Sequence, residues 1–150
     1  MTPPTGAPKT GGDCLFCRIA AGELPAHIVL ADDVAVAFLD ARPVFKGHVL
    51  VIPREHAETL ADLPADALGP YFARVQAVSR AMEDGLGAAG SFVAMNNRIS
   101  QSVPHLHTHV VPRNRKDGLR GFFWPRLKYD NDPEATSYAD KIRKTLKATP

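Results

Sequence analysis

Three histidines alternate with other residues in the stretch VPHLHTHVVPR, residues 103–113. His105, His107 and His109 are separated by a leucine and a threonine and are followed by two valines, a composition typical of a β-strand. Successive side chains of a strand point to opposite faces, so this stretch predicts three imidazoles on one face, with neighbours about 6.8 Å apart. At that spacing they are too far apart to be a simple hydrogen-bonded pair, but they can act together on one phosphate or one metal ion.

The segments on either side of this strand alternate between short strands and helices. Helices are predicted at 14–22, 65–86 and 133–148, and strands on both sides of Asp32-Asp33, at 48–52, at 91–96 and at 105–111. This order, with short connections between strands, predicts an α+β domain with an antiparallel sheet of about five strands, one long helix and a C-terminal helix. Pro70 lies early in the long helix, so we expect either irregular first turns or a regular helix that starts later.

The composition is that of one globular domain. A chain of 150 residues that is 45% hydrophobic is long enough to bury a core without disulfides. Residues 1–12 have the composition of a disordered tail and lack the apolar core of a secretory signal, so the domain is expected to cover 13–150. No apolar run approaches the ~18 residues of a membrane span. These features predict a cytoplasmic protein that does not bind a membrane.

The C-terminal part of the chain is basic. From Arg113 onward there are ten Lys/Arg and five Asp/Glu, a net charge of +5 in a chain whose total is +2. A solvated lysine-rich helix explains most of this charge, and no nucleic-acid polymer is expected as a partner. The arginines of the segment RNRKDGLRGFFWPRLKY, residues 113–129, and its Trp124 are candidates for contacting a polyphosphate or a second base. Packing of this segment over the sheet is the alternative.

The chain has only two cysteines, Cys14 and Cys17, in a C-x-x-C arrangement. A disulfide between residues this close constrains the chain very little, so a structural disulfide is a poor explanation. Two thiolates two residues apart can share one tetrahedral zinc ion, and the six histidines supply further ligands. The pattern therefore favours one structural Zn²⁺, while a redox dithiol and two inert buried cysteines stay open as alternatives.

The alternating histidines allow two kinds of chemistry. Three imidazoles can bind a catalytic metal ion and leave one position for water, which gives a zinc hydrolase. Alternatively, one neutral imidazole attacks a phosphorus atom and forms a covalent phosphohistidine-type intermediate, with a backbone carbonyl accepting its other ring N–H. A nucleotide sensor or scaffold that holds a structural zinc is a third, non-enzymatic hypothesis.

The run HLHTHVV resembles the H-φ-H-φ-H-φ-φ motif of the histidine triad (HIT) family of nucleotide hydrolases and transferases. The segments DDVAVAFLDARPVFKGHVLVIPREH, residues 32–56, and SQSVPH, residues 100–105, are similar to that family as well. The C-x-x-C is similar to its zinc-bearing bacterial branch. The chain departs from the pattern at Thr108, where an apolar residue is usual, and in the short loop NNRISQS, residues 96–102. The resemblance implies a HIT-like fold.

The resemblance also implies an activity. The chain is expected to cleave a nucleoside phosphoramidate or a dinucleoside polyphosphate at the α-phosphorus, to form a nucleotidyl intermediate on His107 and to release a nucleoside monophosphate. Transfer of the nucleotide to an acceptor other than water is the alternative within the same chemistry. A protonated His109, together with His48 and Ser102, is expected to stabilise charge on the phosphate.

The resemblance assigns further residues to the substrate, the metal and a partner. The expected substrate-binding residues are Asp40 at the ribose, Asn96 or Asn97 and Gln101 near the phosphate, and Phe16, Ile19 and Phe38 around the base. The expected zinc ligands are Cys14, Cys17, His56 and His105. The small apolar base pocket suits a purine nucleotide, and the chain is expected to form a homodimer.

Overall fold

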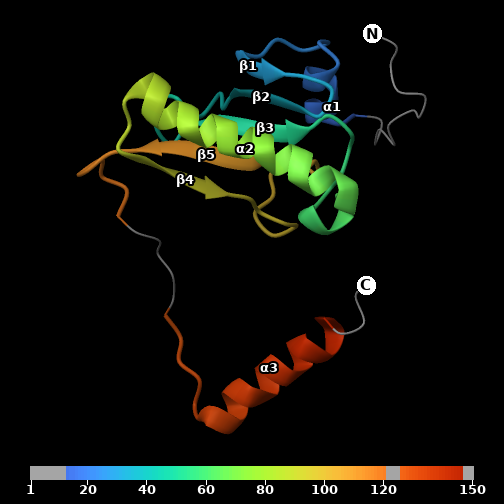
Figure 1. The fold of residues 1–150 in the computed structure, drawn as a ribbon, viewed down its shortest axis with the longest axis vertical. Coiled ribbons are helices and arrows are strands. Elements are labelled where there is room, and N and C mark those ends of the chain that lie inside the picture. The colour runs from blue at the N-terminus through green and yellow to red at the C-terminus, as the bar shows by residue number, and fades with distance from the viewer. Residues whose placement is uncertain (1–12, 121–125, 147–150) are drawn as a thin grey trace. The chain divides into compact units, whose positions relative to one another are not determined.

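The computed structural model describes residues 13–120 and 126–146 (Figure 1). The chain divides into two compact units, of which the first ends at Asp117 and the second begins at Gly118. The first unit contains α1 (Leu15–Ala20), β1 (Ile28–Ala31), β2 (Ala35–Leu39), β3 (Val49–Pro53), the 3₁₀ turn η1 (Leu60–Asp62), α2 (Ala65–Leu86), β4 (Gly90–Ala94) and β5 (Thr108–Arg113). The second contains α3 (Asp132–Leu146). The tail predicted at 1–12 lies outside the described residues.

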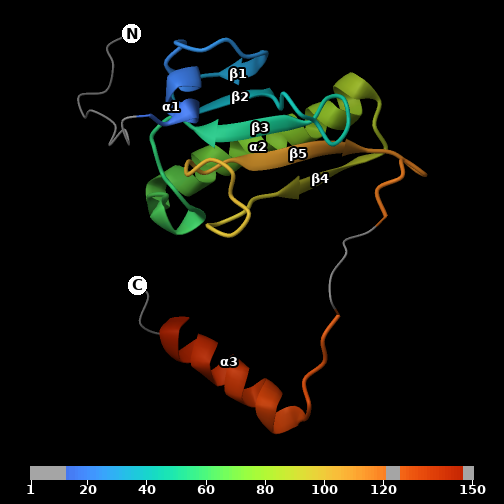
Figure 2. The same ribbon diagram turned by 180° about the vertical axis from the view of Figure 1, so that it is seen from behind.

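The five strands form one sheet in the order β1-β2-β3-β5-β4, and every pair is antiparallel. The predicted α+β class and the antiparallel sheet of five strands are therefore confirmed. The last strand, β5, lies between β3 and β4, so the histidine stretch leads into an interior strand of the sheet (Figures 1 and 2). Among the described helices, none is long and apolar enough to cross a membrane.

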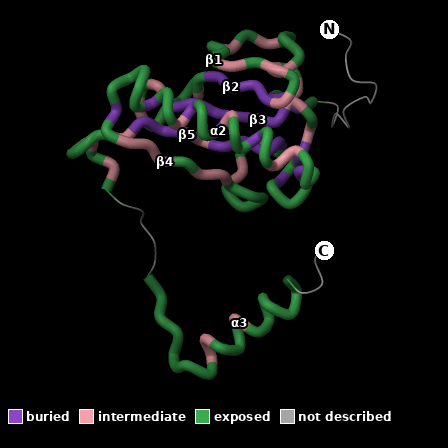
Figure 3. The backbone as a smooth tube through the Cα atoms, viewed as in Figure 1, coloured by how far each residue is buried: buried purple, intermediate pink, exposed green. Residues whose placement is uncertain are grey.

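The two faces of the sheet carry separate cores because alternate strand residues point in opposite directions. Ala35 and Ala37 pack with α2 on one face of the sheet. Figure 1 shows α2 in front of the sheet. Val36 and Phe38 pack on the other face with Phe16 of α1 and with its N-cap residue Cys14. The central strands are buried along their length, as Figure 3 shows. The sequence of β2 and β3 is thus apolar without alternation, because both faces are covered.

Helix α2 has the predicted bounds, and its apolar face is Tyr71, Val75, Val78 and Met82. The helix begins at Ala65 and continues through Pro70, so the expected irregular or late start is wrong. Pro70 is the sixth residue of the helix, and its missing N–H deprives only the carbonyl of residue 66 of a donor. Packing of the apolar face on the sheet stabilises the helix across this position.

The histidine stretch differs from the prediction at its start. Strand β5 begins at Thr108, so His105 and His107 precede the strand and only His109 lies in it. The reason is in the main chain, where the amide of His105 donates to the carbonyl of Val103 at 2.8 Å and the next amide donates to the carbonyl of residue 57 at 2.6 Å. These bonds replace the ladder of a regular strand and turn the chain before β5.

Candidate active site and metal centre

Four predicted metal ligands lie together where α1 meets the loop before β5. The ligand atoms of Cys14, Cys17, His56 and His105 are all within 4.8 Å of one another. Cys14 comes from the N-cap of α1 and Cys17 from its first turn, so one helical turn supplies both sulfurs. Both cysteines are free thiols, and His105 is fully buried.

The spacing of these atoms matches a tetrahedral zinc site. Zinc bonds of about 2.1 Å to nitrogen and 2.3 Å to sulfur give nitrogen–nitrogen edges near 3.4 Å and nitrogen–sulfur edges near 3.6 Å. The two Nδ1 atoms of His56 and His105 are 3.2 Å apart, and each lies 3.3–3.5 Å from the Sγ of Cys17. A redox pair or two inert cysteines would not require two imidazoles at this distance, so the donor set favours zinc over both alternatives.

The hydrogen bond of His105 fixes which nitrogen faces the cluster. Its Nε2 lies 2.9 Å from the carbonyl oxygen of Pro53, which can only accept, so Nε2 carries the proton. The Nδ1 lone pair is then directed at the sulfur of Cys14, at 3.3 Å. This is the arrangement in which a buried imidazole is oriented to ligate a metal through its other nitrogen.

His107 is turned away from the metal ligands by a different bond. Its Nδ1 lies 2.8 Å from the carbonyl oxygen of His105, so Nδ1 donates and Nε2 holds the lone pair, as the expected backbone contact requires. Among the described residues, every fully shielded side-chain nitrogen or oxygen has a hydrogen-bond partner. No bond to a described residue occupies Nε2, so this atom reaches solvent although the side chain is only 2% exposed. Nε2 of His107 is thus a candidate nucleophile that bonds to no described residue and is not fully shielded from solvent.

His48 and His109 form a hydrogen-bonded row beside His107. The amide of Val44 donates to Nδ1 of His48 at 3.1 Å, so the proton of a neutral His48 is on Nε2. That Nε2 lies 3.0 Å from Nδ1 of His109, which therefore accepts and leaves Nε2–H of His109 as a donor. The His107 and His109 rings are 5.1 Å apart, centroid to centroid. The row thus ends in an N–H beside the candidate nucleophile.

Asp40 closes this second cluster. One of its oxygens is 3.7 Å from Nε2 of His48, and the other accepts the amide of Arg42 at 2.8 Å. Asp40, His48 and His109 also lie within ligand distance of one another. Because the Val44 amide occupies Nδ1 of His48, however, a metal at Nε2 would have to break that bond to obtain a lone pair. The bonding pattern favours an oxyanion site over a metal site here.

His105 is one of the four clustered metal ligands and His107 is not, which bears on the hypothesis that His105, His107 and His109 together hold a catalytic zinc. His105 directs Nδ1 at the cysteines, whereas His107 uses Nδ1 to bind the carbonyl of His105. The nitrogens that remain for ligation thus face different clusters. This arrangement disfavours the three-histidine zinc hydrolase.

Burial determines the charge of His48 and His109. Desolvation, with the charges of His107 and His48 adding to it, lowers the pKa of His109 to about 4, although Asp40 opposes the shift. Desolvation also lowers the pKa of His48, again opposed by Asp40. Both rings are therefore neutral near pH 7 in the ligand-free protein, and the protonated His109 expected at the phosphate stays a prediction. A neutral His109 still donates through Nε2–H.

The lowered pKa of His109 predicts a loss of stability in mild acid. Between about 6.5, the ordinary value of histidine, and about 4, the unfolded chain binds a proton at this position that the native chain does not. The free energy of unfolding is therefore expected to fall as the pH falls from 7 to 5, and the His109→Asn variant is expected to show a shallower fall. Urea titrations of zinc-loaded protein at several pH values measure both slopes, and equal slopes for the two proteins would contradict the prediction.

The loop expected to contact phosphate is held by its own side chains. Gln101 accepts the amide of Arg98 at 2.9 Å and donates to the carbonyl of Glu58 at 2.6 Å. Asn97 accepts the amide of Leu60 at 2.8 Å, so its side chain caps a neighbouring turn. Asn96 donates to the carbonyl of Ser100 at 3.3 Å, and Ser102 is exposed. The side chains that hold the loop in shape are thus those of Gln101, Asn96 and Asn97.

The predicted base-pocket residues belong to one apolar cluster. Phe16 and Phe38 are buried there with their rings 5.5 Å apart, and Ile19 is partly buried against them. The ring of Phe16 also meets His107 edge-on at 5.0 Å. This cluster therefore borders the candidate nucleophile, as the resemblance implies for a base pocket.

Three groups in and near the two clusters were not found from the sequence. These are the amide of Val44, the carbonyl of Pro53 and the hydroxyl of Tyr71, which bonds to Thr108 beneath the cluster. A main-chain group is supplied by any residue at its position, so the sequence carries no signal for the first two. For the hydroxyl of Tyr71, the sequence offers one signal, which is the threonine at position 108 where the family pattern usually has an apolar residue.

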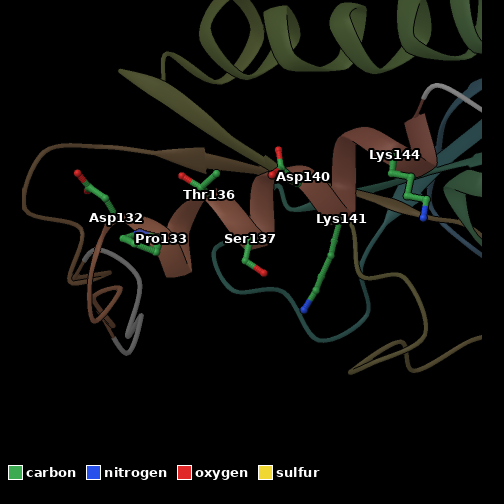
Figure 4. Close-up of a pocket in the computed structure, with 7 residues that line it drawn as sticks. All are labelled: Asp132, Pro133, Thr136, Ser137, Asp140, Lys141 and Lys144. Atoms are coloured by element: carbon green, nitrogen blue, oxygen red, sulfur yellow. The ribbon is translucent and has the colours of Figure 1, made fainter.

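The second unit has a hollow of its own, along α3. Figure 4 shows the residues that line it, which all come from this one helix: Asp132, Pro133, Thr136, Ser137, Asp140, Lys141 and Lys144. None of them belongs to either histidine cluster. In the basic segment, Arg113 pairs with Asp117 through hydrogen bonds of 2.5 and 3.2 Å, and Trp124 lies outside the described residues.

Comparison with known proteins gives consistent matches. The HIT domain family matches residues 21–116. Adenosine 5'-monophosphoramidase hnt1 of Schizosaccharomyces pombe is 35% identical over 123 residues, which are 81% of this chain and 88% of that protein. The crystal structure of a member of the HIT family from Bacillus subtilis is 33% identical and covers 88% of this chain and 96% of its own, with a TM-score of 0.80.

A zinc-containing structure is among the matches. A Zn-bound histidine triad family protein from Mycobacterium smegmatis is 33% identical to this chain. The alignment covers 91% of this chain and 97% of that one, with a TM-score of 0.68.

Proposed function

Because the chain belongs to the HIT domain family, in which nucleotide hydrolases occur, we propose that it cleaves a purine nucleoside phosphoramidate or dinucleoside polyphosphate at the α-phosphorus. The products are a nucleoside monophosphate and the released amine or nucleotide. The observation that carries this proposal is the bond from Nδ1 of His107 to the carbonyl of His105, which leaves Nε2 as an accessible nucleophile outside the metal quartet.

The reaction has two displacements at phosphorus. Nε2 of His107 forms a bond to the α-phosphorus while the P–N or P–O bond to the leaving group breaks, and the leaving amine or nucleotide takes up a proton from solvent. Water then attacks the same phosphorus and gives up a proton to solvent, the P–N bond to His107 breaks, and the monophosphate departs. The Nδ1–H bond to the His105 carbonyl stabilises the imidazole as positive charge develops on it.

The row of histidines suits the charge of this reaction. Nε2–H of His109 is a donor beside His107, and it is polarised by the bond from His48 behind it. Donors in place before the reaction stabilise charge on the phosphate oxygens without rearrangement. Ser102 is assigned to the same oxygens, Asp40 to the ribose, and Phe16, Ile19 and Phe38 to the base.

The metal has a structural part in this proposal. Cys14, Cys17, His56 and His105 would hold one Zn²⁺, which supplies the energy of four ligand bonds to join α1 to the sheet. The proposed catalytic residues are not zinc ligands, and this distinguishes the proposed function from that of a zinc hydrolase. A cytoplasmic location, in which the thiols stay reduced, and a homodimer complete the proposal.

The proposal is tested with adenosine 5'-phosphoramidate and a dinucleoside polyphosphate as substrates. Rapid acid-free quenching and mass spectrometry should detect one nucleotidyl group on His107, and steady-state assays should detect release of AMP. The His27→Gln variant alters an exposed histidine outside both clusters and should keep the adduct and the turnover. Turnover without an adduct, lost on mild chelation and restored by zinc, would instead support the metal-dependent hydrolase. An adduct that an acceptor other than water removes faster would support a transferase.

A further inference from the structure

A buried hydroxyl pair lies beneath the histidine cluster, on the face of the sheet that α2 covers. Tyr71 of α2 donates its hydroxyl proton to the carbonyl of Val51 at 2.8 Å. Its oxygen lies 2.7 Å from the hydroxyl of Thr108, which must then be the donor of that bond. Both side chains are fully buried, so neither hydroxyl can exchange its partner for water.

The pair lies where β3, which follows His48, meets β5, which contains His109. Val51 of β3 is paired with Thr108 of β5, and this is the first pair of the β3–β5 ladder. The next pair joins Leu50 to His109. His48 directly precedes β3, and its Nε2 reaches Nδ1 of His109 across the strands at 3.0 Å. One hydroxyl of α2 therefore joins β3 to β5 at the start of the ladder.

Thr108 also separates His107 from His109. An apolar residue is usual there in the HIT pattern, and an apolar residue would need no partner. Burying a threonine hydroxyl without a hydrogen bond costs much of its hydration free energy. A threonine is tolerated at position 108 because its hydroxyl is hydrogen-bonded to Tyr71. Rotation or displacement of Thr108 would move the backbone of the two histidines on either side.

We propose that Tyr71 is a positioning residue for the reaction, because its hydroxyl fixes the strand start that sets His107 and His109 relative to His48. This inference rests on the proposed function for its kinetic readout, but it also predicts the arrangement of the imidazoles in the protein without substrate. The hydroxyl pair does not touch substrate; it acts through the backbone of Thr108 and the carbonyl of Val51.

A double-mutant cycle tests the proposal. Tyr71→Phe leaves the Val51 carbonyl and the Thr108 hydroxyl without their partner, and Thr108→Val leaves the Tyr71 oxygen without its donor; each is expected to lower kcat by roughly tenfold, with KM changed less than about threefold. The double variant no longer buries an unpartnered hydroxyl, but the Val51 carbonyl still lacks its donor, so its kcat loss should be no greater than that of Tyr71→Phe alone. Thr108→Ser keeps the hydroxyl and should retain kcat, and Tyr138→Phe, the same change at an exposed tyrosine of α3, is the matched control.

A second readout does not depend on turnover. Long-range ¹H–¹⁵N spectra of the imidazoles report the His48–His109 hydrogen bond and the tautomer of His107. The single variants should shift these signals, and the double variant should shift them no further than Tyr71→Phe does, even if the wild type hydrolyses none of the substrates offered. Single variants that lose stability while kcat and the imidazole signals stay at wild-type values would overturn the positioning role. A double variant whose kcat losses simply add would overturn it as well.

Discussion

The His107→Ala variant is expected to lose turnover by roughly three orders of magnitude or more and to form no covalent nucleotide adduct. The reason is that Nε2 of His107 holds a lone pair that bonds to no described residue, in a tautomer fixed by a main-chain carbonyl. Its neighbours cannot replace it, because Nδ1 of His109 already accepts from His48 and His105 faces the cysteines. Steady-state release of AMP and intact mass after quenching measure the two effects.

The same variant should leave the metal centre in place. His107 is not one of the four clustered ligands, so the zinc content of His107→Ala should equal that of the wild type. His107→Gln is a second variant that fills more of the space left by the ring. Full turnover in either variant would refute the nucleophile assignment, and loss of zinc from both would show that His107 belongs to the metal site instead.

The Cys17→Ser variant is expected to lose bound zinc and more than about 4 kcal/mol of unfolding free energy. The Sγ of Cys17 lies 3.3 Å from His56 and 3.5 Å from His105, so this one atom contacts ligands from two separate segments. Without it, a tetrahedral site lacks its fourth bond, and the link from α1 to the sheet is weakened. Elemental analysis should fall from about one zinc per chain to well below one, and urea titration should show the lost stability.

Leu15→Ala is the matched control for that variant. Leu15 lies between the two cysteines in α1 and is 46% exposed, so the substitution changes the same helix without removing a ligand. It should keep the full zinc content and most of the stability. Equal zinc content in Cys17→Ser and wild type would mean that the quartet does not bind zinc.

The elements that sequence predicts best are those whose pattern is local. Helix α2 was predicted with its observed bounds, because its apolar spacing is regular and Pro64 and Gly87 stand at its two ends. The start of β5 was not predicted, because it depends on amide bonds to Val103 and to a distant loop. The pattern of apolar residues in a sequence shows how side chains are spaced. The boundaries of a strand depend instead on main-chain hydrogen-bond partners that are distant in sequence.

The candidate site divides in the same way. The four clustered ligands were identified by residue type and resemblance, and the structure brings them together. The lowered pKa of His109 could not be found from the sequence, because it depends on burial and on the ring of His48, which is 61 residues away in sequence. Tautomers depend on carbonyls and amides, which no residue type reveals.

Pro70 has a consequence for the kinetics of local opening in α2. The first amides of a helix have no partner in a preceding turn, the amide of Ala67 reaches only the N-cap carbonyl of Pro64 at 2.9 Å, and Pro70 has no amide, so few of residues 65–70 donate to the helical ladder. Opening of this first turn and a half breaks fewer hydrogen bonds than opening of any equal stretch farther along. Deuterium is therefore expected to replace amide protons there well before it enters the turns around Val75 and Val78.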